Sequence, residues 1–453
     1  MAPWLAFCVL AFAAVGLGGW CLPSRESRLA KCVWAVLCGI VFQAMLGTFA
    51  AASGCSFPRV FWGLTLLGGL GLPFSIWQIS KSSDCSEKRK LAWFHVVLAF
   101  VFVDALAFGS WAISNTPLSS EDGIFHWSGR ARYLFGDVNW SWDRADENYL
   151  GLATWNRHYP LLIPVWRAVL AGGSAAWTEV AARADGLVYY AAFIGSVWSL
   201  GRRLSASPFW AAAAAIACAC QPLLTWHVQA GNADLATAAF LSAAVNALVR
   251  ERWVVAGMCA SGAVLTKNEG LLVYLPAMLL GLSVGQLKTD HFERKPMLLF
   301  LIGLLPVVPW LLFRLFNRFQ LSPSGEKVGF QSDAILPFLE GFWLNPTSYC
   351  LWVFILISVL ATGARLWAVQ GGKELLSILL SSLGALGFVF VWTEASKWLQ
   401  GDITLQRILM QLSGLGIVAA CSGWSLLGSS LRPAQKENLE GESEQTAAVK
   451  PLE

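Results

Sequence analysis

The chain has 453 residues, of which 56% are hydrophobic and only 13% charged, with a mean hydropathy of +0.56. Soluble domains normally contain about 25% charged residues, so this composition excludes an ordinary soluble domain. The formal net charge of +4 is small and scattered over short loops, which argues against a nucleic-acid partner. The cysteines lie mostly inside apolar runs, and their spacing indicates no disulfide framework.

Apolar runs of about 17–25 residues recur along nearly the whole chain, which predicts an all-α, polytopic transmembrane helical bundle. We expect about thirteen helices, with spans near residues 3–22, 31–52, 58–79, 91–113, 184–200, 207–226, 234–249, 253–266, 271–287, 296–314, 347–365, 374–393 and 405–430. The predicted organisation is therefore N-terminal transmembrane helices (1–113), an outer loop with interfacial helices (114–183), a transmembrane core (184–430) and a disordered cytoplasmic tail (431–453).

Six clusters of basic residues between these spans fall on one side of the predicted membrane. They are Arg25, Arg28, Lys31, Lys81, Lys88, Arg89, Lys90, Arg202, Arg203, Arg250, Arg252, Lys288, Arg294, Lys295, Arg365 and Lys373. By the positive-inside rule that side is the cytoplasm. We expect a multi-pass protein of a bacterial inner membrane, with its N-terminus outside and its C-terminus in the cytoplasm.

The first long outer segment contains a helix-like stretch, SSEDGIFHWSGRARYLF, at residues 119–135. Ser119 is placed to cap this helix, with Asp122 three positions later. Asp122, His126 and Arg130 recur at every fourth position and share one face, while the opposite face is apolar, so we expect the helix to lie flat on the outer leaflet. An ionised aspartate in the first turn is a candidate general base. The alternative is that Glu121 and Asp122 only cap the helix.

Further along the same segment, Arg157-His158-Tyr159-Pro160 leads back towards the membrane. His158 is a candidate to titrate or to hydrogen-bond a substrate. The alternative is a surface histidine at the membrane interface.

Two later motifs open or close short spans on the outer side. Asn232 and Asp234 begin one span, where capping alone could explain both. The span that ends before Lys267, Asn268 and Glu269 has about 14 residues, or roughly 21 Å of helix, against a hydrocarbon core of about 30 Å. These three side chains should therefore lie below the outer surface, where charges face a wet cavity or one another. Lys267 is expected either to face an anionic ligand, such as a lipid phosphate, or to pair with Glu269.

Arg407 lies just inside the last span, at the depth of the outer leaflet. An arginine at this depth needs a partner, and a phosphate group matches its planar donors. The alternative is that Arg407 extends its side chain to the lipid headgroups.

Together these motifs resemble the GT-C superfamily of membrane glycosyltransferases, which includes protein O-mannosyltransferases and aminoarabinose transferases. Family-39-like bacterial members carry W-D-x(4)-W-x(2)-K/R-x-R in the first large outer loop, then H-x-D-Y-P. The first pattern is similar to the sequence at Asp122, Trp127, Arg130 and Arg132, with Glu121 in place of the tryptophan; the second survives as His158-Tyr159-Pro160, with His158 where relatives carry an acid. G-x-A-D matches Gly231–Asp234, and T-K-N-E-G matches Thr266–Gly270.

The resemblance implies an inverting transferase that uses a polyprenyl-phosphate-linked sugar and a lipid, glycan or protein acceptor, with membrane lipids around it. It implies Asp122 as the catalytic base, with Glu121 as the second candidate. Phosphate or substrate contacts are then expected from His126, Arg130, Arg132, His158, Tyr159, Asp234, Lys267, Asn268, Glu269 and Arg407. The sequence requires no cofactor and leaves a divalent metal open.

Two other classes of function compete with this hypothesis. A transporter or flippase of a lipid-linked or small polar substrate would also contain intramembrane charge, but such proteins tend to have internal repeats and midplane polar residues. We find no repeat, and the charges gather at one face. The departures from the family pattern at Glu121 and His158 suggest the other alternative, a catalytically inactive relative.

Overall fold

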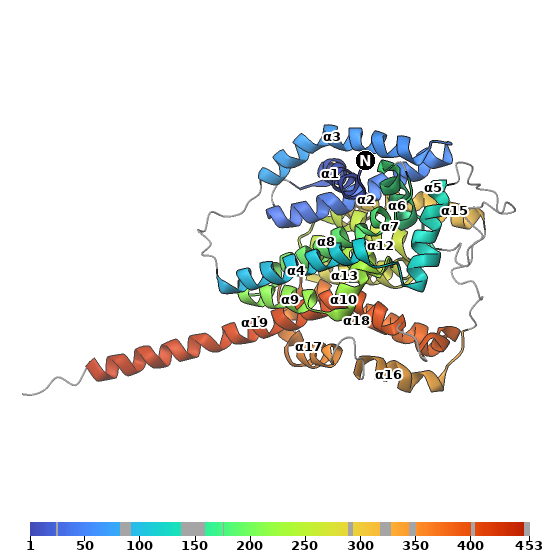
Figure 1. The fold of residues 1–453 in the computed structure, drawn as a ribbon. Coiled ribbons are helices and arrows are strands. Elements are labelled where there is room, and N and C mark those ends of the chain that lie inside the picture. Colours follow the sequence, from blue (N-terminus) through green and yellow to red (C-terminus); the bar gives the residue numbers. More distant parts are fainter. Residues whose placement is uncertain are drawn as a thin grey trace, which may run out of the picture.

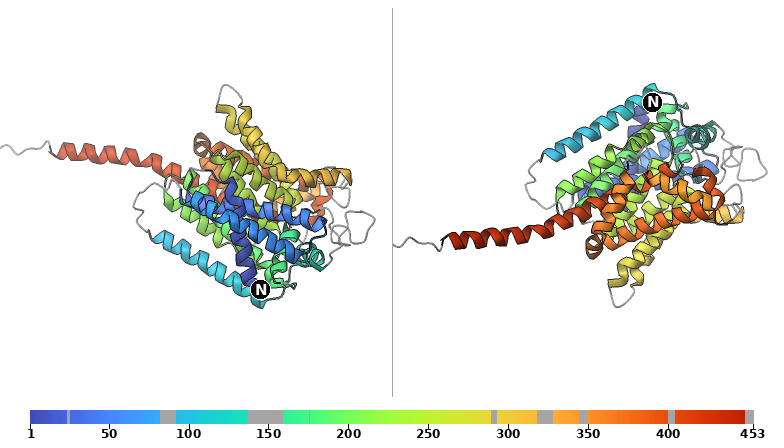
Figure 2. Two further views of the ribbon diagram at one scale, coloured as in Figure 1. Left: turned by 90° about the horizontal axis from the view of Figure 1, so that it is seen from above. Right: turned by 90° about the horizontal axis from the view of Figure 1, so that it is seen from below.

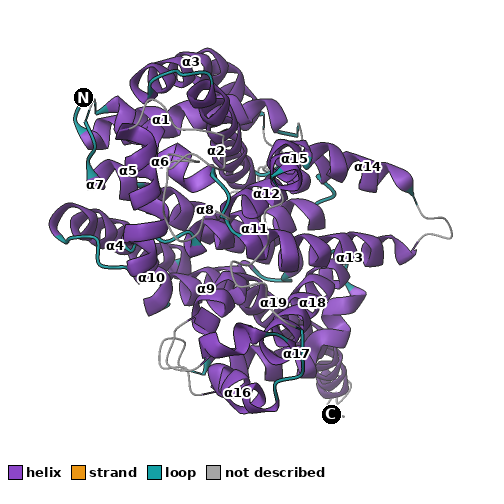
Figure 3. Cartoon of the chain, turned by 90° about the vertical axis from the view of Figure 1, so that its right-hand side faces the viewer, coloured by secondary structure: helices purple, strands orange, loops and turns teal. Residues whose placement is uncertain are grey.

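The computed structural model describes residues 1–23, 26–81, 92–136, 159–174, 176–288, 293–317, 328–343, 350–399 and 404–447. Within these ranges every regular element is a helix, and Val328 and Thr393 form an isolated bridge without a strand (Figure 3). The predicted all-α class is confirmed.

The N-terminal helices pack closely on one another at one edge of the bundle (Figure 1). They are α1 (Pro3–Gly18), η1 (Gly19–Cys21), α2 (Arg28–Ala52) and α3 (Phe57–Ser80). The next helix, α4 (Trp93–Asn115), packs elsewhere, on the segment 208–229. Glycine makes the α1–α2 contact possible, because a Cβ on Gly18 or on Gly39 would lie 1.8 Å from a carbonyl oxygen of the facing helix. Small residues allow such close approach between apolar helices.

Deeply buried helices, most of them short, occupy the centre of the bundle. They are α6 (Leu162–Gly173), α8 (Asp185–Leu204), α11 (Asp234–Val249) and α12 (Trp253–Thr266). Every residue of α11 is buried, and the indole nitrogen of Trp34 on α2 donates to the carbonyl of Ala243 within it. Because α11 is covered on all sides, its two ends are the places where polar groups can be reached from outside.

The remaining elements surround this centre. Two of them are bent pairs, α9 (Pro208–Ala219) with α10 (Pro222–Gln229) at 58°, and α14 (Arg294–Gly303) with η5–α15 at 43°. The others are η2 (Gly123–Ser128), α5 (Gly129–Gly136), α7 (Glu179–Arg183), η3 (Gly270–Tyr274), α13 (Leu275–Gly285), η4 (Gln286–Lys288), η5 (Leu305–Val307), α15 (Val308–Phe316), η6 (Ser332–Ala334), α16 (Ile335–Trp343), α17 (Leu351–Ala368), α18 (Gly372–Trp392), η7 (Glu394–Leu399) and α19 (Thr404–Ala447).

Seven described helices are long and apolar enough to cross a membrane, or up to nine if each bent pair is one span. All thirteen predicted segments are helical, but thirteen is more than the number that could cross by length and composition. Helices α11 and α12 and the pair η3–α13 have lengths below a full crossing. These segments are apolar because they are buried among other helices, and burial in protein produces the same sequence pattern as burial in lipid.

The last helix, α19, runs from Thr404 to Ala447 and projects away from the bundle in both views of Figure 2. The sequence predicts a disordered tail from 431, whereas the structure continues the helix through most of that segment. The residues there include many good helix formers, such as alanine, glutamine, lysine and glutamate.

The bundle has two chemically different ends. At one, the Glu26 carboxylate accepts hydrogen bonds from Arg250 and Arg252, and Lys31 donates to the carbonyl of Lys81. These basic residues gather on one side, as the charge pattern predicts. The candidate site lies at the opposite end of α11, close to α5, while the C-terminal part of α19 leaves from the other end of the bundle (Figure 1). Which end faces the cytoplasm stays a prediction.

Candidate active site

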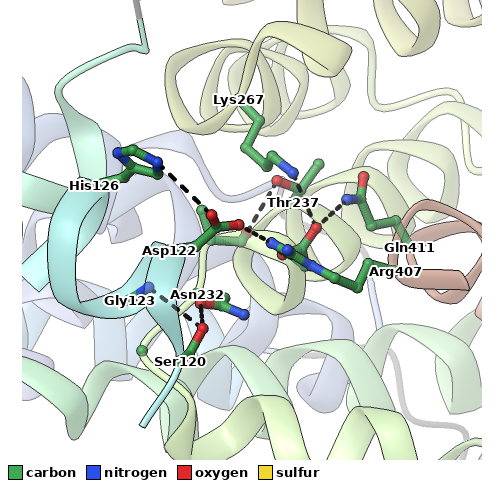
Figure 4. A network of polar contacts seen from close by, with 12 residues as sticks. Ser120, Asp122, Gly123, His126, Asn232, Thr237, Lys267, Arg407 and Gln411 are labelled. Carbon is green, nitrogen blue, oxygen red and sulfur yellow. Dashed lines mark hydrogen bonds and ion pairs between the residues drawn. The ribbon is translucent and has the colours of Figure 1, made fainter. Parts of the chain in front are cut away.

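Asp234, the first residue of α11, is the centre of a buried polar network (Figure 4). Its side chain is 0% exposed. One carboxylate oxygen accepts from Lys267 Nζ at 3.0 Å and from Gln411 Nε2 at 2.7 Å, and the other from Arg407 Nη2 at 2.7 Å and Nε at 3.2 Å. The position at a helix N-terminus adds favourable backbone dipoles to these charged partners. Asp234 is therefore fully occupied, and its capping role in the sequence analysis is wrong because its oxygens face other helices.

Arg407 joins Asp234 to the outer helix. Its Nη2 also donates to Asp122 Oδ2 at 2.5 Å, so one guanidinium nitrogen contacts two carboxylates. The predicted alternative, an arginine extended to the headgroups, is wrong because Arg407 is only 14% exposed and turned inwards. Asp122 is 33% exposed, which makes it the most accessible acid among those that pair with Arg407 and Lys267.

Lys267 follows α12 and lies between two acids. Its Nζ is 3.0 Å from Asp234 and 2.9 Å from Glu269, so the predicted Lys267–Glu269 pair is present and a second partner is added. Asn268, the residue between them in sequence, accepts from Arg314 Nη1 at 2.9 Å. Lys267 is buried, whereas Asn268 and Glu269 are half-buried.

The outer helix differs in detail from the prediction. It is capped by Ser120 rather than Ser119, since Ser120 Oγ accepts from the backbone N–H of Gly123 at 3.4 Å. Residues Gly123–Ser128 form a wide π-type turn, which changes the spacing at which side chains share a face. As a result Asp122 and His126 stay neighbours, with His126 Nε2 3.8 Å from Asp122 Oδ1, while Arg130 turns into the protein.

The apolar face of the outer helix packs on protein rather than on the leaflet. Trp127, Ala131 and Leu134 are buried, and α5 lies against α6. These three side chains therefore contact protein where the sequence pattern predicts lipid, because α6 offers an apolar surface that the pattern could not reveal, while Ile124 on the same face is exposed.

Tyr159, His126 and Arg130 form the wall beside this network. Arg130 Nη1 donates to the backbone carbonyl of Tyr159 at 2.8 Å, and the Tyr159 ring lies 5.0 Å from the Trp127 ring and 6.2 Å from that of His126. Burial lowers the pKa of His126, although Asp122 opposes this, and burial raises the pKa of the Tyr159 phenol. Near neutral pH both rings are uncharged.

A second buried network fixes the outer helix to the loop before α11. Arg167 on α6 forms a bidentate pair with Asp185, at 2.8 and 3.1 Å, and its Nη1 donates to Ser128 Oγ and to the carbonyl of Gly231 at 2.6 Å. Gly231 has φ +69°, a conformation that favours glycine. Arg167 thus links the helix that carries Asp122 with the turn that leads to Asp234.

A direct contact supports the same alignment. Ser120 Oγ donates to Asn232 Oδ1 at 2.6 Å, and a Cβ on Gly123 would lie 2.4 Å from the carbonyl of Ala230. The backbone beside Asp122 can approach the Gly231–Asp234 turn this closely only because residue 123 lacks a side chain.

Three predicted site residues do not join the network. Glu121 and Arg132 are exposed, and no hydrogen bond or ion pair connects either with the rest of the described chain. Arg130 is buried on a backbone carbonyl and is not open to a phosphate. His158 lies outside the described residues.

Sequence reasoning missed Gln411, Arg167 and Asp185. Gln411 lies one helical turn after Arg407, so it shares a face with a predicted site residue, and it also accepts from the Tyr274 hydroxyl at 2.7 Å. Arg167 lies within an apolar run and Asp185 at the start of one, and a charge in such a place is itself a signal of a partner.

No group of three or more histidine, cysteine, aspartate or glutamate side chains that could hold a metal occurs in the part of the chain that the structure describes.

Neither a family model nor a curated protein matches the chain. Among solved structures, the chain is similar to the crystal structure of the Archaeoglobus fulgidus oligosaccharyltransferase complex with Zn and sulfate. The TM-score is 0.43 with 13% sequence identity, over 75% of this chain and 49% of that chain. The chain thus spans about half the length of that protein. A likeness at this level establishes neither a shared activity nor shared site residues.

Proposed function

We propose that the protein is a membrane glycosyltransferase that moves a sugar from a polyprenyl-phosphate donor to a hydroxyl group of an acceptor. One observation carries the proposal: an accessible carboxylate, Asp122, and a cation, Arg407, meet in a largely buried network at one end of an apolar helical bundle. A base for the acceptor and a counter-ion for a leaving phosphate are the two groups that such a transfer needs. The resemblance of the motifs around both residues to membrane glycosyltransferases supports the same reaction.

Asp122 is the proposed general base. Arg407 occupies its Oδ2, while Oδ1 accepts no hydrogen bond from the described residues and has only His126 nearby, at 3.8 Å. An acceptor hydroxyl that donates to Oδ1 would lose its proton there as its oxygen attacks the anomeric carbon. With the phosphate leaving from the opposite face of the sugar, the configuration at that carbon inverts.

The depth of the network suits a donor with a lipid tail. Asp234 and Lys267 lie at the ends of α11 and α12, whose lengths are below a full membrane crossing. In our proposal both ends lie within the thickness of the bilayer, where charges normally face a cavity or each other. A phosphate on a prenyl chain could reach this level while its chain stays in the leaflet.

The proposal is tested with the purified full-length chain in lipid nanodiscs, supplied with radiolabelled polyprenyl-phosphate hexoses and pentoses and with host membrane extract as the acceptor. We expect label in the extract and at least about 100-fold less with Asp122→Asn, since general acid–base catalysis contributes about 10²–10⁴-fold. Asp333→Asn is the matched control, because Asp333 is an exposed acid outside the network. Glu121→Gln should lose less than threefold; loss equal to that of Asp122→Asn would move the base to Glu121.

Other outcomes separate the competing functions. Counterflow of a lipid-linked or polar solute in vesicles, without any transfer, would favour a transporter. Neither transfer nor counterflow with the full donor panel would favour an inactive relative.

A further inference from the structure

We infer that Arg407 couples the two halves of the proposed reaction. Its Nη2 holds the base Asp122, and its Nη1 receives the leaving phosphate. This inference rests on the proposed function and names the group that binds the donor phosphate.

The donors of Arg407 are divided unequally. Nε and Nη2 are directed at Asp234, and Nη2 also at Asp122, at 2.5–3.2 Å. Nη1 donates to none of the described residues, and it is not among the buried atoms that lack a partner. Arg407 therefore presents one unused nitrogen on its accessible side, next to the base. The planar guanidinium fixes the direction of that nitrogen.

Lys267 is less suited to the phosphate. Its side chain is 7% exposed, and its ammonium already lies within 3.0 Å of both Asp234 and Glu269. Asp234 and Glu269 already neutralise its charge, and its remaining N–H lies on a side chain that is almost wholly buried. We assign Lys267 to holding Asp234 in place.

The net charge of the network also favours Arg407 over Lys267 as the phosphate ligand. The acids Asp122, Asp234 and Glu269 face the bases Arg407 and Lys267, so three negative charges meet two positive ones and the network has a net charge of −1. A phosphodiester is not attracted by such a site as a whole. It needs a local donor with spare capacity, and Nη1 of Arg407 is that donor.

The transfer step then keeps the charge around Arg407 constant. The acceptor O–H bond breaks and its proton goes to Asp122 Oδ1, while the new bond forms between the acceptor oxygen and the anomeric carbon. The bond from that carbon to the phosphate oxygen breaks, and its electron pair stays on the phosphate. Asp122 loses one negative charge as the phosphate gains one, so a single fixed guanidinium stabilises both states with little rearrangement.

This arrangement makes Asp122 and the phosphate competitors for one cation, which a binding experiment can detect without any transfer. The probe is polyprenyl phosphate in detergent micelles, titrated into the full-length protein at equilibrium. Asp122→Asn removes the competing charge, so polyprenyl phosphate should bind about tenfold more tightly, corresponding to about 1.4 kcal/mol. Asp333→Asn should change the dissociation constant by less than twofold.

The double variant decides whether Arg407 is responsible. In an Arg407→Gln background, Asp122→Asn should tighten binding by less than twofold, and an equal tenfold gain there would overturn the inference. Arg407→Lys preserves the charge if Arg407→Gln fails to fold, and one ammonium held by Asp234 should likewise abolish the coupling. Arg407→Lys should lower kcat and also raise the KM for the donor, whereas a purely structural loss would reduce only the active fraction and leave KM unchanged.

Inorganic phosphate separates a lipid-linked ligand from a free one. It should bind at least about 100-fold more weakly than polyprenyl phosphate, and equal affinity would overturn the lipid assignment. The binding test fails independently of the transfer test: coupled binding without sugar transfer refutes the proposed function alone, and transfer without coupling refutes the role of Arg407.

Discussion

Replacing Arg167 with lysine should disturb the candidate site from a distance, because Arg167 aligns the helix of Asp122 with the turn before Asp234. The guanidinium forms two hydrogen bonds with Asp185 and one each with Ser128 and the Gly231 carbonyl. A lysine keeps the charge but has one nitrogen, which cannot span partners that lie on three different segments.

The size of the effect follows from burial. Arg167 is 2% and Asp185 0% exposed. If lysine satisfies half of the four contacts, two buried acceptors lose their donor at about 1–3 kcal/mol each. We expect Arg167→Lys to lower the free energy of unfolding by about 3 kcal/mol, and removal of the charge in Arg167→Met to cost somewhat more.

Two measurements distinguish stability from alignment. The first is the thermal unfolding midpoint of the purified protein in detergent, and the second is the transfer rate per folded molecule. A displacement of about 1 Å can cost about 100-fold in rate, so transfer by Arg167→Lys should fall by at least tenfold even where the variant is fully folded.

The double variant Arg167→Met, Asp185→Leu refines the test. Replacing a whole buried ion pair by apolar side chains is often neutral for stability. The unfolding midpoint should therefore recover towards that of the wild type, while transfer stays low because Gly231 and Ser128 still lack their donor. Recovery of both properties would show that Arg167 serves stability alone, and a wild-type rate in Arg167→Lys would refute the alignment.

Three further predictions concern the same network. Gly123→Ala should reduce transfer at least tenfold, because the alanine Cβ would meet the Ala230 carbonyl at 2.4 Å and push Asp122 away. Transfer assays check this if the unfolding midpoint of the variant is unchanged, and a wild-type rate would contradict it. Burial lowers the pKa of His126 from 6.5, so the unfolded chain binds the proton first and stability falls as the pH drops below about 6.5. Between pH 7.5 and 5.5 the unfolding midpoint should therefore fall less steeply for His126→Gln than for the wild type. An equal fall in both proteins would exclude this contribution. Lys267→Met should destabilise the protein by about 3–5 kcal/mol, because the buried Asp234 carboxylate loses a charged partner. Thermal unfolding measures this loss, and an unchanged midpoint would make Lys267 a candidate phosphate ligand again.

The sequence predicted the helical class and several of the charged residues that the fold brings together. Apolar runs and short motifs are local properties, so the helices, the burial of Lys267 and the shared end of Asp122, Asp234 and Arg407 could be predicted. The number of crossings could not, because α11 and α12 are as apolar as membrane spans while protein surrounds them. An apolar side chain indicates only that its position is shielded from water, and both lipid and protein can shield it.

Apart from the Lys267–Glu269 pair, the partners of these charged groups depended on tertiary structure. From the sequence, the expected partners of Arg407 are a phosphate or the lipid headgroups. In the structure its partners are Asp122 and Asp234, which lie 285 and 173 residues away along the chain. It likewise turned Arg130 inwards through the π-type turn and brought Arg167 to Gly231. Sequence fixes which side chains are charged and roughly how deep they lie; the packing of helices fixes the distances between them, and charges interact according to distance.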